Sequence, residues 1–381
     1  MEIYDPVHGN IFIDSLAKQI VDTEEFQRLR NIKQLGCCYY VFPGASHNRF
    51  EHSLGVYHLA KEYIQILNTE HQFTDNDIKC ISIGALIHDL GHGPYSHLFD
   101  DLVSKEKNHE YRSIKLFESM NTKYNLGFTN IDIDYIHKII YPKDINEEKK
   151  YLYQIVSNIN GVDVDRFDYL MRDITMIGLN YGIEYQRIMK HSKIVNNEII
   201  YSSKVKLNID DFFRTRYIMY KEIYNHHTVR SIEFMIQEFL KQSEDIFGFK
   251  KAVMNDDWNK FILFTDSIIE QINFIPDVKP ELIELVQRIK KRDLYKLIGE
   301  IYTNNPHILG KNNKSMIVDV VCLKQYGSEQ CKYYTTKNII DFTKQDTKDT
   351  EYVISVYTKN SHNYEIEKQL FQIMTRDLKN Q

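Results

Sequence analysis

The sequence predicts a mostly α-helical protein that ends in a small α+β lobe. Apolar residues recur at helical spacing through most of the first 245 positions, and residues 210–245 contain neither glycine nor proline. Short alternating segments gather only after residue 295. The chain has 381 residues, of which 43% are hydrophobic, enough for a substantial core. We therefore expect a large domain over residues 1–245, followed by a helical extension and the small α+β lobe over residues 246–381.

Helix-capping and helix-breaking residues predict the N-terminal helices and strand. Residues 2–14 combine a turn with an alternating apolar stretch, which predicts a short strand. Ser15 is expected to cap a first helix through residue 20, and Thr23 marks another that ends at Gly36. The next helix carries His52 on a different face from its apolar side chains. Further helices are expected over residues 77–90, 109–124, 133–140 and 147–159, and then after the break at Gly161.

The later elements change in character along the chain. A hairpin is expected at residues 193–195 and 199–202, around Asn196 and Asn197. A long helix should then cover residues 210–245, with two more between 255 and 291. Strands are expected at residues 295–301, 317–323, 332–336 and 352–358, before a final helix over 364–376.

Composition limits the classes of function. The formal net charge is −5, so no global positive field attracts nucleic acid, and a polyanion must be held by a local group of lysines and arginines. The five cysteines lack the spacing of a zinc ribbon and indicate reduced thiols. Signal-peptide features and long apolar runs are absent. We therefore expect a soluble, intracellular protein that does not engage a membrane.

A histidine and an aspartate, His88 and Asp89, stand side by side at the end of an apolar helix. With His52 upstream and Asp165 far downstream, they offer two imidazole nitrogens and two carboxylate oxygens. This donor mix suits iron, manganese, zinc or cobalt better than calcium. Alone, a His-Asp pair is more often a surface or capping pair. The glycines and further histidines that follow at once favour a site.

The helix that carries Asp165 presents a second pattern. Asp165, Tyr169 and either Arg172 or Asp173 fall one turn apart and therefore share a face. Such a face joins a carboxylate, a phenol and a further charged group. A plain solvated helix face is the alternative interpretation.

Five stretches carry a family resemblance. They are DPVHG at residues 5–9, FQRLR with IKQLG at 26–36, YYVFPGASHNRFEHSLG at 39–55, HDLGHGP with SH at 88–97, and GVDVDRFDY at 161–169. On these motifs the chain resembles the HD-domain phosphohydrolase superfamily. Within it, the chain looks most like the catalytic region of the SAM- and HD-domain-containing deoxynucleoside triphosphate (dNTP) triphosphohydrolases, without the SAM domain. The resemblance is strong to about residue 245 and weaker beyond.

The resemblance implies a helical HD-domain fold that hydrolyses dNTPs to deoxynucleoside and inorganic triphosphate, with a divalent metal at the HD site and Mg²⁺ on the triphosphate. The implied metal ligands are His52, His88, Asp89 and Asp165. The implied catalytic residues are His92, His97, His109 and Asp100. The implied phosphate contacts are Arg49, Arg166 and Arg216, and the sugar and base contacts are Gln34, Leu35, Tyr169, Asp173 and Tyr224.

The resemblance also implies regulation and assembly. Positions of a GTP or dGTP activator site are matched by Asp22, Gln27, Arg30, Arg187, Lys204 and Lys206. Met1 and Glu222 stand where the family has basic residues, so activation and assembly as a homo-oligomer, a dimer or tetramer, are expectations with departures. Single-stranded nucleic acid is a further candidate partner. Two alternatives remain open: another HD-domain phosphohydrolase acting on nucleotides, and a non-catalytic nucleic-acid-binding scaffold.

Overall fold

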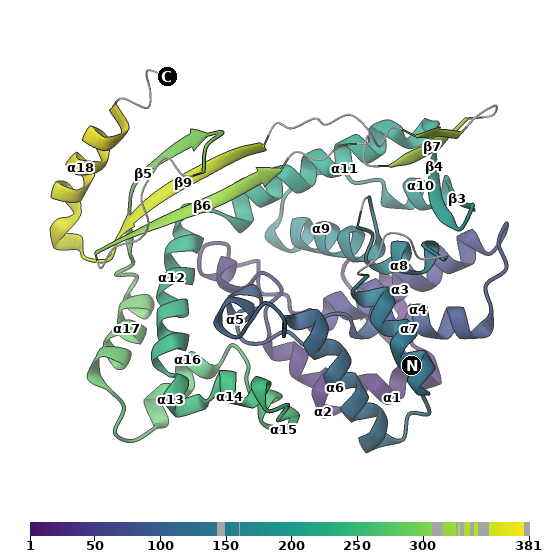
Figure 1. The fold of residues 1–381 in the computed structure, drawn as a ribbon, viewed down its shortest axis with the longest axis horizontal. Helices are drawn as coiled ribbons and strands as arrows, with labels where there is room; N and C mark the ends of the chain where they lie inside the picture. The colour runs from purple at the N-terminus through teal and green to yellow at the C-terminus, as the bar shows by residue number, and fades with distance from the viewer. Residues whose placement is uncertain are drawn as a thin grey trace. The chain divides into compact units, whose positions relative to one another are not determined.

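The computed structural model describes residues 1–142, 149–159, 161–306, 315–324, 327, 331–335, 339–341 and 350–376. Helices predominate among them, which confirms the predicted mostly α class (Figure 1). Within these ranges, no helix combines the length and the apolar character that crossing a membrane requires.

The chain divides into two compact units. The first comprises Met1–Thr215, Phe247–Ile268 and Tyr326–Gln345, and the second comprises Arg216–Ile246, Ile269–Gln325 and Asp346–Gln381. The sequence-based domain boundary at residue 245 stays a prediction.

The first unit is built around one buried helix, α3 (Arg49–Leu67), against which α4 (Asp75–Ile87) and α9 (Val164–Ile177) pack. Gly55 makes the approach of α9 possible, because a Cβ there would overlap the carboxylate of Asp168. The other helical elements of this unit are α1 (Ser15–Val21), α2 (Glu24–Gln27), η1 (Arg28–Asn31), η2 (Gly36–Tyr40), α5 (His97–Leu102), α6 (His109–Tyr124), α7 (Asn130–Ile140), α8 (Tyr151–Val156), α10 (Tyr185–Lys190), η3 (Ser203–Val205), most of α11 (Lys206–Ile218), α14 (Phe249–Met254) and α15 (Trp258–Phe261).

Two small sheets belong to the first unit. Strands β1 (Glu2–Asp5) and β2 (Gly9–Phe12) form an antiparallel hairpin. Strands β3 (Ser192–Val195), β4 (Glu198–Ser202), β7 (Lys332–Tyr334) and β8 (Ile339–Asp341) form the other, in that order. The β3–β4 hairpin confirms the prediction, with Asn196 and Asn197 both at positive φ, as its tight turn requires. The assignment of residues 332–336 to the C-terminal lobe was wrong, because β7 pairs in parallel with β4; residue 336 lies outside the described residues.

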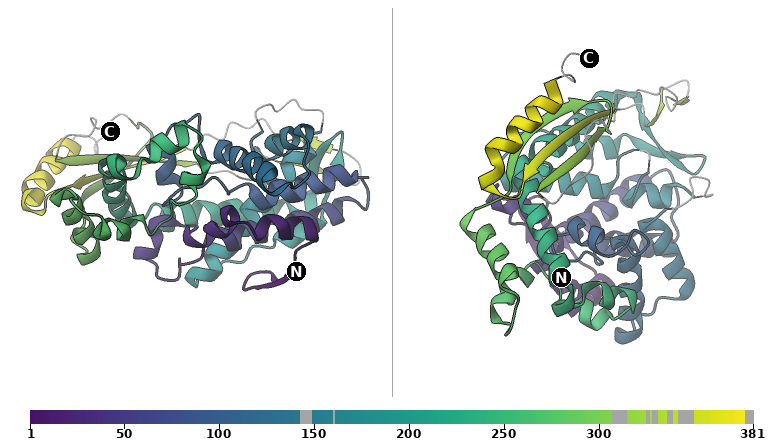
Figure 2. Two further views of the ribbon diagram at one scale, coloured as in Figure 1. Left: turned by 90° about the horizontal axis from the view of Figure 1, so that it is seen from below. Right: turned by 60° about the vertical axis from the view of Figure 1, so that its left-hand side comes forward.

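The second unit contains the small α+β lobe. Its antiparallel sheet has the order β5 (Lys296–Thr303), β9 (Thr350–Thr358), β6 (Met316–Lys324). Helix α18 (Tyr364–Arg376), at the predicted position, packs on β5 (Figure 2). Gly299 in β5 leaves room for the ring of Phe371. The remaining elements are η4 (Met219–Tyr224), α12 (His227–Gln242), α13 (Glu244–Phe247), α16 (Ile268–Gln271), η5 (Ile272–Phe274), α17 (Pro280–Lys291) and η7 (Ser361–Asn363).

Three local predictions need correction. The expected helix over residues 210–245 is interrupted, because a π-helical turn follows α11 and the side chain of His226 caps a new helix by accepting from the Thr228 amide. The first helix is capped by Asp14, which accepts from the Ala17 amide. The helix that begins after Thr23 is a single turn that passes into the 3-10 turn η1. Residues 147 and 148 of another expected helix lie outside the described residues.

Candidate metal centre and adjoining histidine cluster

Three helices deliver the four predicted metal ligands. His52 lies in the first turn of α3, where Asn48 caps the helix, and His88 ends α4 directly before Asp89. Asp165 lies in the first turn of α9, which Asp163 caps. The two histidines and Asp89 are buried, whereas one third of the Asp165 side chain is exposed. Asp165 is therefore the member of the set that is most accessible to solvent.

The donor atoms of these residues converge. The Nε2 atoms of His52 and His88 are 3.2 Å apart. Asp165 Oδ1 lies 3.1 Å from Nε2 of His52 and 3.6 Å from Nε2 of His88. Each carboxylate oxygen of Asp89 lies 3.5 Å from one of the same two nitrogens. Donors placed at about 2.0–2.2 Å around one ion are separated by roughly 3–3.5 Å, so the spacing fits a single metal.

Hydrogen bonds on the far side of each ring fix the orientation of the two histidines. Nδ1 of His52 donates to Asp168 Oδ2 at 2.7 Å, and Nδ1 of His88 donates to the carbonyl of Ala85 at 2.8 Å. Because each proton is on Nδ1, the Nε2 lone pairs face one another, as metal-ligating imidazoles require. The residues present therefore fit a divalent metal.

The electrostatics of the centre also favour a cation. Burial lowers the pKa of His52, but hydrogen bonds to Asp165 and Asp168 outweigh it and raise this pKa to about 10. Burial opposes ionisation of both ligand carboxylates, yet Arg49 with His88 and His92 lowers the pKa of Asp89. Hydrogen bonds and charge from His52 and His88 lower the pKa of Asp165. The ionised carboxylates therefore favour a positive charge between them. A bound divalent ion would supply that charge in place of an added proton on His52.

A buried charge network that the sequence did not reveal supports His52. Asp168 is fully buried and accepts hydrogen bonds from Nε2 of His8 at 2.6 Å and from Nε of Arg172 at 2.9 Å. Arg172 in turn donates to Asp5 at 2.7 Å. The available signal was that Asp168 lies one turn after Asp165. A spacing argument cannot tell such a buried carboxylate from a solvated one.

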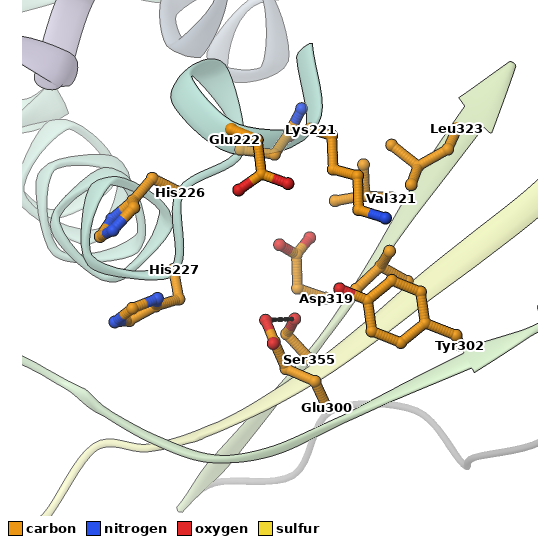
Figure 3. A pocket seen from close by; sticks show the side chains of 12 residues that line it. Lys221, Glu222, His226, His227, Glu300, Tyr302, Asp319, Val321, Leu323 and Ser355 are labelled. Carbon is orange, nitrogen blue, oxygen red and sulfur yellow. Dashed lines mark hydrogen bonds between the residues drawn. The ribbon is translucent and has the colours of Figure 1, made fainter. Parts of the chain in front are cut away.

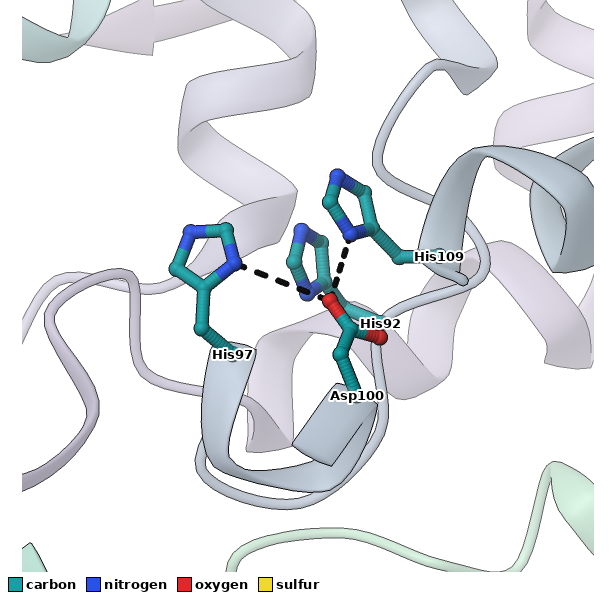
Figure 4. A group of neighbouring side chains, drawn as sticks. All are labelled: His92, His97, Asp100 and His109. Carbon is teal, nitrogen blue, oxygen red and sulfur yellow. Dashed lines mark hydrogen bonds and ion pairs between the residues drawn. The ribbon is translucent and has the colours of Figure 1, made fainter. Parts of the chain in front are cut away.

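The predicted catalytic residues form a second cluster, in which His97 and His109 point toward Asp100 from two sides (Figure 4). Nδ1 of His109 lies 2.7 Å from the Asp100 carboxylate, and Nδ1 of His97 lies 3.7 Å from it. His92 stacks on His109 with ring centroids 4.0 Å apart. Nε2 of His92 is 3.2 Å from Asp89 Oδ1, so the cluster adjoins the metal centre.

The three histidines occupy different environments. His92 is buried, and burial with the neighbouring charges of Arg49 and His109 lowers its pKa well below the usual value. The side chain of His97 is 75% exposed. Asp100 is held ionised against its burial by His109, His97 and Arg112, which lower its pKa. His97 is therefore the imidazole of this cluster that a substrate reaches most easily.

Arg49 connects the metal centre to the loops around it. Its Nε donates to Ser96 Oγ at 2.8 Å, its Nη1 pairs with Asp89 Oδ2, and its Nη2 lies 3.4 Å from the carbonyl of Gln34. Gln34 and Leu35 are half-buried in the same turn. The guanidinium of Arg49 is therefore fixed beside a predicted metal ligand.

The other predicted substrate contacts differ from one another in burial and in their hydrogen-bond partners. Tyr169 lies one turn after Asp165 on α9 and is half-buried, whereas Asp173 is fully buried and accepts from Nε2 of His47 at 2.7 Å. Arg166 pairs with Asp163, its own helix cap. Two further predicted contacts, Arg216 in α11 and Tyr224 in η4, belong to the second unit, and their roles stay predictions.

The predicted activator residues lie at several places in the first unit. Arg30 donates to the side chain of Gln27 at 2.8 Å, and Asp22 pairs with Lys18. The remaining positions are Arg187 in α10, Lys204 in η3 and Lys206 at the start of α11. Their role in activation stays a prediction.

A polar cavity of about 110 Å³ lies in the second unit, between η4, the start of α12 and the sheet. The carboxylates of Glu222, Asp319 and Glu300 face it (Figure 3). Asp319 is paired with Arg230 at 2.8 Å, and Glu300 accepts from Ser355 at 2.9 Å. No motif or residue pattern in the sequence indicated a site here.

In comparisons with known proteins, the chain matches two family models: the HD domain over residues 49–173 and the HD associated region over residues 183–369. The chain is 37% identical over 340 residues to the putative HD domain-containing protein L394 of Acanthamoeba polyphaga mimivirus, covering 78% of this chain and 73% of that protein. It is also 37% identical to the deoxynucleoside triphosphate triphosphohydrolase SAMHD1 homolog of Dictyostelium discoideum, covering 80% of this chain, and to human SAMHD1, covering 78%. The matches span 61% and 55% of those two relatives, less than two thirds of their length.

Proposed function

The chain belongs to the HD-domain family, and on that premise we propose that it is a metal-dependent dNTP triphosphohydrolase. The observation that carries the proposal is the contact between two clusters: His92 of the histidine cluster lies 3.2 Å from Asp89 of the metal centre. A phosphoryl group beside the metal would thereby lie next to side chains that can transfer protons. The similarity to relatives named dNTP triphosphohydrolases supports the same reaction.

The proposed reaction adds water to the α-phosphorus and breaks its bond to the 5′-oxygen. The products are a deoxynucleoside and inorganic triphosphate. A divalent metal held by His52, His88, Asp89 and Asp165 would polarise the phosphoryl group and lower the pKa of a water molecule. Iron, manganese, zinc and cobalt suit this donor set, and Mg²⁺ would accompany the triphosphate.

Side chains of the protein would bind the phosphates and protonate the leaving group. Arg49 would bind phosphate oxygens through its forked guanidinium. The leaving 5′-oxygen needs a proton, and the exposed His97 beside Asp100 is the proposed donor. His109, bound to the same carboxylate, would hold Asp100 in place. Gln34, Leu35, Arg166, Tyr169, Asp173, Arg216 and Tyr224 are the proposed further contacts to substrate.

Regulation and assembly are part of the same proposal. We infer activation by GTP or dGTP at Asp22, Gln27, Arg30, Arg187, Lys204 and Lys206, in a homo-oligomer. The support is the similarity to SAMHD1 proteins across most of the chain. Glu222, an exposed acid at a position where the family is basic, argues for weaker or altered activation.

The test is product analysis. Purified protein is incubated with each dNTP and each rNTP, with Mg²⁺ or Mn²⁺, with and without GTP or dGTP, and the products are separated by chromatography. We expect deoxynucleoside and intact triphosphate from dNTPs, abolished by Asp165→Ala and kept by Asp134→Asn, which changes an exposed carboxylate on α7. Monophosphate with pyrophosphate would indicate another HD-domain phosphohydrolase. No product from folded, metal-loaded protein would refute the enzyme and favour the nucleic-acid-binding scaffold.

A further inference from the structure

Asp266 joins two loops that contact Arg49 beside the metal centre, although it lies in none of the motifs that mark the site. It occupies the turn between α15 and α16, within the first unit. Its Oδ2 accepts from the backbone amide of Lys33 at 2.8 Å, and its Oδ1 accepts from the backbone amide of Tyr95 at 2.7 Å. One carboxylate thus binds two segments that are 62 residues apart in sequence.

The backbone of the same turn adds two more bonds. The phenol of Tyr95 donates to the carbonyl of Asp266 at 2.9 Å, and the amide of Asp266 donates to the carbonyl of Asn31 at 3.1 Å. Asp266 therefore contacts each loop through both its side chain and its main chain.

The segment held by Asp266 is strained. Tyr95 and Ser96 have φ angles of 56° and 57°, a region that residues other than glycine rarely adopt. Such a backbone persists only where its surroundings hold it. Gly36 lies directly against it, because a Cβ at Gly36 would stand 3.4 Å from the carbonyl oxygen of Tyr95. The two loops are thus packed together at the point where Asp266 binds both.

This geometry determines the position of Arg49. Ser96 Oγ donates to the carbonyl of Lys33 at 3.1 Å and accepts from Nε of Arg49 at 2.8 Å. The other end of the Arg49 guanidinium pairs with Asp89. A loop that relaxed from its strained conformation would carry Ser96 away and leave Arg49 without its lateral support.

We propose that Asp266 is a positioning residue that holds the two loops so that Arg49 can bind the phosphates of the substrate. The effect on substrate rests on the proposed function, whereas the effect on the loops does not. Asparagine cannot replace the carboxylate, because its single oxygen serves one amide while its NH₂ group faces the other N–H. Loss of such a bond by a buried amide weakens the joined structure by about tenfold.

The experiment compares metal-loaded wild type, Asp266→Asn and Asp101→Asn, the last changing an exposed carboxylate on α5. Hydrogen exchange is followed by mass spectrometry in peptides that cover residues 31–36 and 93–97. Binding of inorganic triphosphate is measured by calorimetry. We expect Asp266→Asn to speed exchange in both peptides by about tenfold, to leave α6 unchanged and to weaken triphosphate binding by about tenfold. Asp101→Asn should match wild type.

Steady-state kinetics separate positioning from a general loss of structure. A displaced Arg49 predicts a raised KM for dNTP with a smaller fall in kcat, whereas partial unfolding would lower kcat alone by reducing the active fraction. Unchanged exchange in the two peptides, or faster exchange throughout the chain with unchanged triphosphate affinity, would overturn the proposal.

Two further outcomes are distinguishable. If wild type hydrolyses nothing, the proposed function fails, and the exchange and triphosphate measurements still decide the role of Asp266. If Asp266→Asn does not fold, Tyr95→Phe removes the phenol bond to Asp266 and keeps the carboxylate. It should speed exchange in residues 93–97 by a few fold, and no change there would refute the proposed link.

Discussion

Replacing Asp168 by asparagine should weaken metal binding at a site that Asp168 does not itself contact. Asp168 has no exposed surface and is the hydrogen-bond partner of the His52 Nδ1 proton at 2.7 Å. It also accepts from His8 and, with both oxygens, from Arg172. Asparagine offers one oxygen and brings an NH₂ group against these donors. His52 then loses the partner that fixes its tautomer and ring orientation.

The magnitude follows from that loss. Removing an outer partner of a ligating histidine typically lowers metal affinity by about 10–100-fold, or about 1.4–2.8 kcal/mol. Stability should fall as well, because breaking a buried ion pair costs about 3–5 kcal/mol. Metal affinity is measured by titrating apo-protein with Mn²⁺ and recording the free ion by electron paramagnetic resonance. Stability is measured by urea unfolding of the apo-protein.

Asp5→Asn is the matched control, because Asp5 binds the same Arg172 but does not contact His52. It should lower stability and leave Mn²⁺ affinity within about twofold of wild type, since the Asp168 acceptor remains. Equal Mn²⁺ affinity of Asp168→Asn and Asp5→Asn, at equal folded fraction, would refute a role for Asp168 in metal binding.

Three further predictions concern the residues around the centre. His97→Gln should lower kcat by about 10²–10⁴-fold, as expected for loss of a general acid, with metal content unchanged by mass spectrometry; equal turnover would exclude His97 as the donor. Arg49→Lys should weaken inorganic triphosphate binding about tenfold or more in calorimetry, because lysine cannot reproduce the fork that spans Ser96 and Asp89, and unchanged affinity would count against its phosphate role. Burial raises the pKa of Asp266 to about 6 from an ordinary 3.8, so its folded state binds a proton between these values. Proton binding by Asp266 therefore stabilises the folded state fully below pH 3.8, and this stabilisation is lost as pH rises through about 6. The unfolding free energy of wild type relative to Asp266→Asn should therefore increase as pH falls from 7 to 4, and a difference independent of pH would contradict the assignment.

Regular elements with strong local signals were predictable from the sequence. The final helix and the helix after His109 begin and end at the expected residues, because apolar spacing and caps act over a few positions. The interrupted helix at residues 210–245 was not, since a π-helical turn contains no residue that breaks a helix. The pairing of β7 with β4 joins residues more than 130 positions apart. No local pattern encodes that contact.

The candidate site also has a part that the sequence predicts and a part that it does not. Its donors were predictable, because the H…HD…D set stands beside glycines and further histidines and within motifs of the HD-domain family, and the structure brings the donor atoms together. Their metal role stays a prediction. What holds them was not predictable: Asp168 and Arg172 are charged residues on a helix and resemble a solvated face until α3 covers them.

The cost of burying those charges explains why the centre depends on the fold as a whole. Asp168, Arg172 and Asp5 are removed from water, which is unfavourable unless every donor and acceptor is paired. The pairs link the N-terminal hairpin to α9 and, through His52, to α3, so each must be in place before the others are satisfied. This packing requires glycine at position 55, because any side chain at Gly55 would displace the Asp168 carboxylate. The position of His52 is therefore set by long-range folding contacts, and a substitution at Gly55 should impair metal binding as severely as one at Asp168.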